Sequence, residues 1–115
     1  MDNPFDREKY PTLAPECLVI GQFIGWKLGY EYASAEFSLR YVLSPIGATD
    51  DTTDLTINGS SVDLTDDTYW VFEVDTAAST AYGVTKDTEY RWDLILTQTG
   101  SGNETAIRSG FMRFF

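Results

Sequence analysis

The 115 residues have room for one domain with a single core, which the 43% apolar and 15% aromatic content is large enough to fill. Eighteen acidic residues against eight basic ones give a net charge of −10, which repels the phosphates of nucleic acids and of anionic lipids and so argues against both as partners. The absence of histidine removes the commonest general base, the Ser-His and Cys-His nucleophile pairs and the His-based zinc motifs, so we expect no enzyme and no cofactor.

Residues 1–16 are predicted to form an extended arm that precedes the folded domain of residues 17–115. Proline lacks an amide donor and favours extended backbone in the residue before it, and the arm contains three: Pro4, Pro11 and Pro15. Its apolar side chains are spaced too irregularly for a helix face: Phe5, Tyr10 and Leu13. The arm either frays loosely over its own domain or orders on a neighbouring subunit, and the second alternative makes these three side chains candidate contacts with a partner.

The first residues also indicate where the protein is located and whether its cysteine can form a disulfide. Residues 1–6 lack the basic and apolar regions of a secretory signal, and no apolar run approaches the length of a membrane span, so we expect a protein made and kept in a cytoplasm. Cys17 is the only cysteine and can neither close an intrachain disulfide nor complete a Cys-based metal site. We expect it to be a small apolar filler.

From Leu18 onward, an alternation of period two predicts strands. Residues 18–28 are expected to form the first strand, in which Gly21 and Gly25 suggest a bulge or a close approach of another segment. Residues 37–43 have the cleanest alternation of apolar and polar side chains, and a proline and a glycine end that strand shortly afterwards.

The middle of the chain is predicted to contain a β-hairpin. The pair Asn58-Gly59 readily takes positive φ, and strand-like segments flank it at 55–57 and 61–64. Small residues at 75–83, with an aspartate at the start and a glycine at the end, suggest one helical turn. The strand before that turn has an apolar face: Trp70, Phe72 and Val74.

The C-terminal part is predicted to be an antiparallel pair of strands, because the glycine-rich turn at 99–103 separates residues 89–97 from residues 104–115. The last strand carries apolar side chains on both of its faces: Phe111, Met112, Phe114 and Phe115. Such a strand has to be covered on both sides, either by the arm of the same chain or by a neighbouring protein. In the second case these four side chains are candidate partner contacts.

Six or seven short strands with turn signals between them predict an all-β fold, either a sandwich or a small barrel. The tryptophans fall on predicted inward faces and are expected in the core: Trp26, Trp70 and Trp92. The alternative is a carbohydrate-stacking platform, which needs two or more of them exposed.

Two predicted loops are acidic, and a sandwich can bring them together. Their aspartates are Asp50, Asp51, Asp54, Asp63, Asp66 and Asp67. Carboxylate oxygens suit Ca²⁺, but the spacing matches no EF-hand loop. We therefore expect solvated loops and no metal, with a Ca²⁺ site as the alternative.

Several short motifs follow one another between residues 12 and 111. They are Leu13-Ala14-Pro15, Gly21-Gln22-Phe23-Ile24-Gly25-Trp26, Phe37-Ser38-Leu39-Arg40-Tyr41-Val42-Leu43, Thr80-Ala81-Tyr82, Tyr90-Arg91-Trp92-Asp93 and Ile107-Arg108-Ser109-Gly110. In this order the chain resembles small immunoglobulin-like structural proteins of tailed bacteriophages, which are encoded among head and head-tail connection genes. Related domains occur at the start of baseplate and fibre proteins.

The resemblance implies an immunoglobulin-like antiparallel β-sandwich of about seven strands with an extended N-terminal arm. It implies structural roles, and no catalytic ones, for the matching residues: Gly21, Trp26, Thr80, Ala81, Tyr82, Tyr90, Trp92 and Gly110. The expected function is that of a non-enzymatic virion protein, made in the host bacterial cytoplasm, that decorates or connects the capsid, neck or tail. Its arm and C-terminal strand make the contacts, and many copies in a symmetric assembly add their affinities. The alternative is a carbohydrate-binding β-sandwich module, with or without Ca²⁺.

Overall fold

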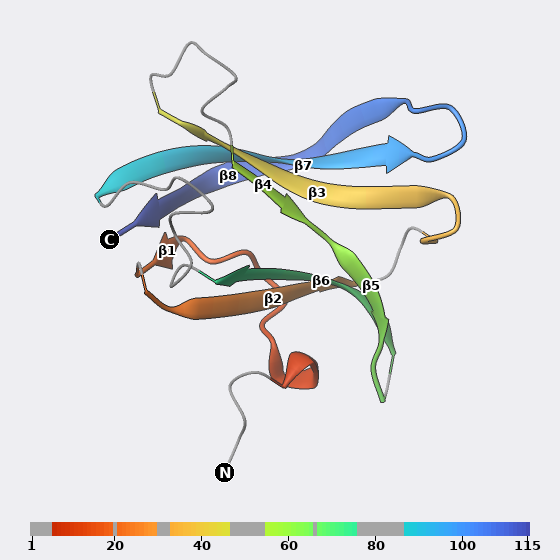
Figure 1. Ribbon diagram of the computed structural model, residues 1–115, viewed down its shortest axis with the longest axis horizontal. Helices are drawn as coiled ribbons and strands as arrows, with labels where there is room; N and C mark the ends of the chain where they lie inside the picture. The colour runs from red at the N-terminus through yellow and green to blue at the C-terminus, as the bar shows by residue number, and fades with distance from the viewer. Residues whose placement is uncertain (1–5, 20, 30–32, 47–54, 66, 76–86) are drawn as a thin grey trace.

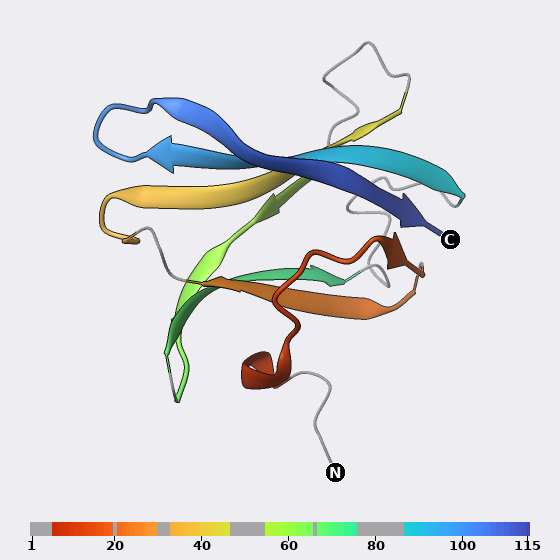
Figure 2. The same cartoon turned by 180° about the vertical axis from the view of Figure 1, so that it is seen from behind.

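The computed structural model of the chain is a β-sandwich, drawn from two opposite sides in Figures 1 and 2. It describes residues 6–19, 21–29, 33–46, 55–65, 67–75 and 87–115. The strands are β1 (Cys17–Leu18), β2 (Phe23–Gly29), β3 (Phe37–Pro45), β4 (Leu55–Asn58), β5 (Ser60–Asp63), β6 (Thr68–Asp75), β7 (Thr88–Gln98) and β8 (Glu104–Phe114). The all-β prediction is therefore confirmed.

One sheet has the strand order β1-β8-β7-β3-β4 and the other has the order β2-β6-β5. All neighbouring strands are antiparallel except β1 and β8, which are parallel. The fold is therefore an antiparallel β-sandwich with one parallel pair, β1 and β8, at the edge of its larger sheet. The two sheets cross as stacked layers in Figure 1.

The core lies between the sheets and has an aromatic centre. Phe72 on β6 stacks on Trp26 of β2 with ring centroids 5.9 Å apart, and Tyr41 of β3 meets both rings edge-on at 4.6 and 5.3 Å. Edge-to-face and offset contacts of this kind stabilise a core beyond the burial of the apolar area alone. Apolar residues on the inward faces of both sheets complete the layer: Leu39, Leu43, Leu55, Ile57, Trp70, Val74, Tyr90, Leu94, Met112 and Phe114.

The clearest period-two segments form the strands they predict. β3 pairs along its length with β7, and β7 pairs with β8 through the predicted turn. In that turn the Gly102 N–H donates to the carbonyl of Gln98, and Gly102 has a φ of +74°, a conformation that other residues rarely adopt. A bulge interrupts the β7–β8 pairing beside Leu94 and Ile95.

The first predicted strand, over 18–28, is wrong as a single element. β1 belongs to one sheet and β2 to the other, and a turn separates them. Gly21 has a φ of +101° in this turn, so the glycine marks a change of sheet rather than a bulge. The close approach suggested for Gly25 is confirmed, because a Cβ at that position would lie 2.4 Å from the Tyr10 ring.

The predicted hairpin at Asn58-Gly59 is also wrong. β4 pairs with β3 in one sheet and β5 pairs with β6 in the other, so the chain crosses from sheet to sheet at Gly59 (Figure 1). Gly59 donates its N–H to the Leu39 carbonyl at 2.8 Å, and a Cβ on it would lie 2.8 Å from the Phe72 ring. Glycine is needed here because the strand passes against the core, and not because it must take positive φ.

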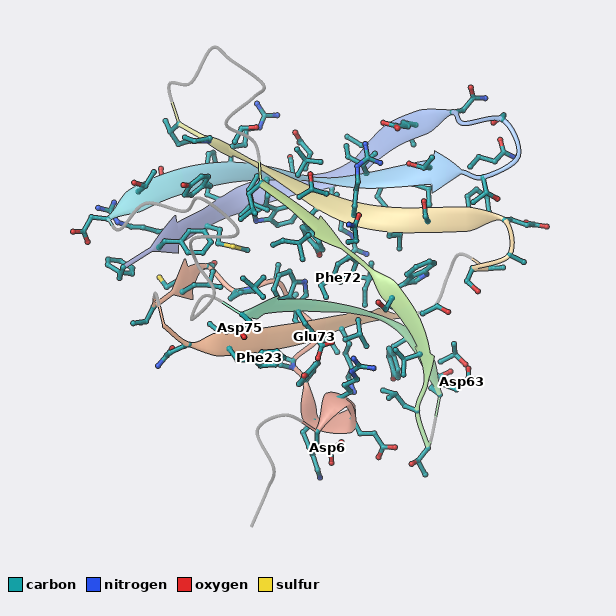
Figure 3. All side chains as sticks on the ribbon, viewed as in Figure 1. Asp6, Phe23, Asp63, Phe72, Glu73 and Asp75 are labelled. Atoms are coloured by element: carbon teal, nitrogen blue, oxygen red, sulfur yellow. The ribbon has the colours of Figure 1, made fainter. Side chains whose placement is uncertain are left out.

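Within the described part of the arm, residues 6–11 are docked on the outer face of the second sheet and do not lie loosely on it. A short 3-10 helix (Arg7–Lys9) follows Asp6, which caps it by accepting from the Glu8 N–H. Figure 3 shows Phe72 between the sheets and Glu73 on the opposite side of β6, facing this helix. Glu73 accepts hydrogen bonds of 2.7 Å from both Arg7 and the Tyr10 hydroxyl.

Further polar contacts hold the same segment. The Glu8 carboxylate accepts from the backbone N–H and the hydroxyl of Thr65, and Lys27 Nζ donates to the Glu8 carbonyl at 2.8 Å. Tyr10 is buried although it does not belong to the core between the sheets. The described part of the arm is therefore packed on its own chain.

Some predictions fall where the structure describes nothing. The helical turn proposed for 75–83 lies outside the described residues apart from Asp75, which ends β6. Phe5, the Thr80-Ala81-Tyr82 motif and four of the candidate calcium ligands, Asp50, Asp51, Asp54 and Asp66, are likewise outside them.

Candidate functional site

The arm bridges the open side of the sandwich, where β8 and β2 are the facing strands. The Lys27 N–H of β2 donates to the Pro11 carbonyl at 2.8 Å, and the Arg113 N–H of β8 donates to the Glu16 carbonyl at 2.9 Å. Residues 12–16 thus pass from one sheet to the other, as Figure 2 shows. Pro15 lies within this crossing and has no amide to pair with a strand.

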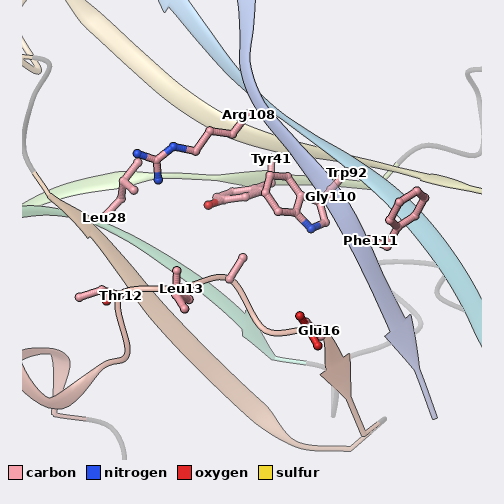
Figure 4. Close-up of a pocket in the computed structure, with 10 residues that line it drawn as sticks. Thr12, Leu13, Glu16, Leu28, Tyr41, Trp92, Arg108, Gly110 and Phe111 are labelled. Atoms are coloured by element: carbon pink, nitrogen blue, oxygen red, sulfur yellow. The ribbon is translucent and has the colours of Figure 1, made fainter.

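A cleft of about 250 Å³ opens between this crossing and the inner side of β8 (Figure 4). Its lining comes from the arm, β2, β3, β7 and β8: Thr12, Leu13, Ala14, Glu16, Leu28, Tyr41, Trp92, Arg108, Gly110 and Phe111. The volume is below the range of about 300–1,000 Å³ that holds drug-sized ligands. It fits a single side chain or a small molecule.

Trp92 forms an aromatic wall of the cleft. Its ring meets that of Tyr41 edge-on at a centroid distance of 5.0 Å. Across the strand pair, Gly110 lies opposite Trp92, and a Cβ at Gly110 would be 2.6 Å from the indole ring. Gly110 therefore lets the indole lie flat against β8, a structural role of the kind that the resemblance implies.

Two polar groups point into one end of the cleft. Arg108 lies opposite the buried Leu94 in the β7–β8 register, so its side chain starts from the inner face of β8. In Figure 4 the Arg108 guanidinium and the Tyr41 hydroxyl both reach towards Leu28, whereas Glu16 lies away from them, just before β1. The cleft thus has a cationic end and an anionic end.

Tyr41 is only 2% exposed, although its side chain helps to line the cleft. Burial raises the pKa of Tyr41 above its ordinary value, while the neighbouring Trp26 indole N–H and the charge of Arg108 oppose this shift. The Trp26 N–H is buried and makes no hydrogen bond of normal geometry with any described residue. The Tyr41 hydroxyl thus connects the core to the cleft.

The predicted partner contacts divide into exposed and buried residues. Leu13, Phe111 and Phe115 are 76%, 58% and 41% exposed, and we call these three side chains the apolar contact surface. Phe111 is an exposed residue of β8 and Phe115 directly follows that strand, and Leu13 and Phe111 both border the cleft.

Tyr10, Met112 and Phe114 are buried within the chain and do not lie on its surface. Tyr10 is covered because the arm docks on the second sheet. Met112 and Phe114 belong to the inward register of β8 and pack in the core. Of the four apolar residues of the last strand, the inward pair is therefore covered by the chain itself, and only Phe111 and Phe115 remain exposed.

Other predicted sites are placed as follows. Trp26 and Trp70 are core residues, and only Trp92 is partly exposed, so these three do not form a sugar-stacking platform. Within the described ranges, no three Cys, Asp or Glu side chains lie close enough together to hold a metal ion. Cys17 is exposed on β1 and is not the apolar filler that we expected.

Sequence reasoning missed Arg108 and the Tyr41 hydroxyl as parts of a site. A signal for Arg108 is present in the sequence. In the period-two pattern of the last strand, Arg108 falls on the same inward face as Gly110, Met112 and Phe114. A charged residue at an inward position near a sheet edge indicates a place where the core is open. Tyr41 carries no such signal, since its apolar ring fits the core pattern of β3.

Among the described residues, no helix combines the length and the apolar character that a membrane span requires. Comparison with models of known protein families and with curated protein sequences finds no match to this chain.

Proposed function

We propose that the chain is a non-enzymatic structural protein of a bacteriophage virion, which binds a neighbouring virion protein through Leu13, Phe111 and Phe115. The observation that carries this proposal is the exposure of three large apolar side chains on a small acidic domain, two of which, Leu13 and Phe111, border the same cleft. Apolar groups gathered in this way on a surface are typical of protein contacts. The sandwich supplies a rigid support for them.

The geometry of the arm supports the same proposal. Residues 6–11 and 16–18 are held by hydrogen bonds to both sheets, so Leu13 stands on a short bridge anchored at each end. A side chain presented from an anchored segment loses little conformational entropy on binding. This favours Leu13 and Phe111 as preformed contacts.

The proposal that the assembly is a virion rests on the resemblance of this chain to immunoglobulin-like phage proteins. In a symmetric shell or ring, the same modest contact is repeated many times, and the affinities of linked copies reinforce one another. A contact made by three apolar side chains is sufficient under these conditions.

The proposal is tested on purified particles of the phage that encodes this chain. A photo-crosslinking amino acid at position 13 or 111 is expected to join the chain to one and the same virion protein, identified by mass spectrometry. Position 46 is the matched control, because Ile46 is 53% exposed but lies at the end of β3, outside the apolar contact surface.

Two results would overturn the proposal. The first is absence of the chain from purified particles, and the second is equal crosslinking from positions 13, 111 and 46. Cryo-electron microscopy of the same particles then tells whether the contact belongs to the capsid, the neck or the tail.

A further inference from the structure

The cationic end of the cleft contains hydrogen-bond donors for which the described part of the chain supplies no acceptor. Arg108 takes part in none of the ion pairs or hydrogen bonds recorded for the described residues, whereas Arg7, Arg40 and Arg91 each pair with a carboxylate. Its guanidinium therefore lines the cleft without a described carboxylate bonded to it.

The Tyr41 hydroxyl is a second polar group at this end of the cleft, and it makes none of the hydrogen bonds recorded for the described residues. Tyr41 is almost fully buried, but its side chain borders the cleft. Because a hydroxyl donates one hydrogen bond, the Tyr41 proton is available to water or to a ligand in the cleft.

From these contacts we propose that the cleft binds a carboxylate carried on an apolar body, with the carboxylate held by Arg108 and Tyr41. Arginine and hydroxyl donors together suit a carboxylate, because charge-assisted hydrogen bonds to it are about twice as strong as neutral ones. The apolar body lies against Trp92 and Leu13. The site shares its border with the apolar contact surface, but binding of a free acid requires no assembly.

The far end of the cleft restricts the choice of ligand. Glu16 lines it, so a second negative charge on the ligand would be repelled there. A monocarboxylate therefore fits better than a dicarboxylate. The ligand source is either a free small acid or the acidic side chain of a protein flanked by apolar residues.

Binding is measured by ¹H–¹⁵N NMR on the isolated chain, whose three tryptophans give three indole N–H signals. The probes are phenylacetate and its neutral amide, phenylacetamide. We expect phenylacetate to shift the Trp92 and Trp26 signals saturably, with a dissociation constant on the order of 1 mM. Phenylacetamide is expected to bind at least about tenfold more weakly, because it lacks the charge.

Three variants test the assignment of residues. Arg108→Gln and Tyr41→Phe are expected to weaken binding by about tenfold and about fivefold, because each loses a hydrogen bond to the carboxylate. Glu16→Gln is expected to strengthen it by about threefold, because it removes a like charge. Arg91→Gln is the matched control, since Arg91 is exposed on the neighbouring strand and lies outside the lining of the cleft.

The blocked tripeptide amides Ac-Phe-Glu-Phe-NH₂ and Ac-Phe-Gln-Phe-NH₂ separate the two sources. Tighter binding of the glutamate peptide than of phenylacetate identifies a protein side chain, and the reverse identifies a free acid. Equal affinities for acid and amide, or an unchanged dissociation constant for phenylacetate in Arg108→Gln, overturn the carboxylate site. Neither result affects crosslinking at Leu13 and Phe111, so this site and the proposed virion contact can fail independently.

Discussion

Gly25 and Gly110 mark two places where an aromatic ring lies against the backbone of a strand. At Gly25 the ring is Tyr10 of the arm, and at Gly110 it is Trp92 of the cleft. A methyl group at either position would overlap the ring, because the distances from a Cβ are 2.4 and 2.6 Å. The absence of a side chain at Gly25 therefore allows the arm to dock, and its absence at Gly110 sets the shape of the cleft.

Gly25→Ala is expected to lower the free energy of unfolding by about 1–3 kcal/mol, since the Tyr10 ring has to move off the strand. Gly29→Ala is the matched control on the same face of β2, because a Cβ there meets nothing within 4 Å. We expect it to change stability by no more than about 0.5 kcal/mol. Urea unfolding followed by tryptophan fluorescence measures both, and equal losses would contradict the docking of Tyr10.

The Arg7–Glu73–Tyr10 cluster makes the same docking depend on pH. Burial acts to raise the pKa of Glu73, but hydrogen bonds from Arg7 and Tyr10 and the charge of Arg7 outweigh it and hold the pKa below 4.5. A carboxyl whose folded pKa lies below its unfolded value contributes stability above the unfolded value, and loses it as the pH falls through the folded one. Burial and the bond to Glu73 raise the pKa of Tyr10 to about 12, so its contribution is lost only as the pH rises through that value.

Glu73→Gln is therefore expected to cost about 1 kcal/mol at pH 7 and to reduce the loss of stability between pH 5 and pH 3. Urea unfolding over this range is the measurement. Glu36→Gln is the control, because Glu36 is exposed and its carboxylate makes none of the hydrogen bonds recorded for the described residues. An unchanged pH dependence in Glu73→Gln would show that other carboxylates dominate.

At the scale of elements, β4 and β5 form one continuous edge that changes sheet at Gly59. In a hairpin, both Asn58 and Gly59 would require positive φ. Here neither residue has it, and Gly59 is confined instead by the Phe72 ring and the Leu39 carbonyl.

Gly59→Ala is expected to destabilise the protein by about 2–3 kcal/mol, because Phe72 is fully buried and has little room to move. Asn58→Ala is expected to change stability by less than about 0.5 kcal/mol, since Asn58 is exposed and extended. Thermal unfolding of the two variants measures the difference. A large cost at both positions would indicate a hairpin turn instead of a crossing.

The sequence correctly predicts those strands and turns whose signal lies within a few neighbouring residues. Strand β3 alternates residue by residue, and the turn before β8 contains a glycine that needs positive φ, so neither depends on distant residues. The crossing at Gly59 and the division between β1 and β2 depend on which sheet each half joins, which local alternation does not encode. The cleft could be predicted only in part. The alternation of the last strand places Arg108 on its inward face, but the position of the arm over it results from long-range hydrogen bonds.

For the molecule as a whole, the net charge of −10 opposes folding, since the compact state brings like charges closer together. Raising NaCl from about 20 to about 300 mM at pH 7 is expected to raise Tm by about 3–5 °C, because salt screens this repulsion. The same titration close to the sequence pI of about 4.1 should have little effect. A fall in Tm with salt at pH 7 would show instead that ion pairs such as Arg7–Glu73 outweigh the repulsion.

The parallel pairing of β1 and β8 has a mechanical consequence. Arg113 and Phe115 donate their N–H groups to the carbonyls of Glu16 and Leu18, so the chain's first and last strands are bonded side by side and run in the same direction. A force that pulls the chain before β1 and after β8 in opposite directions loads both bonds together in shear, instead of opening them one at a time. Once residues 6–11 have been pulled off the second sheet, traction along the chain is therefore resisted by this two-residue strand.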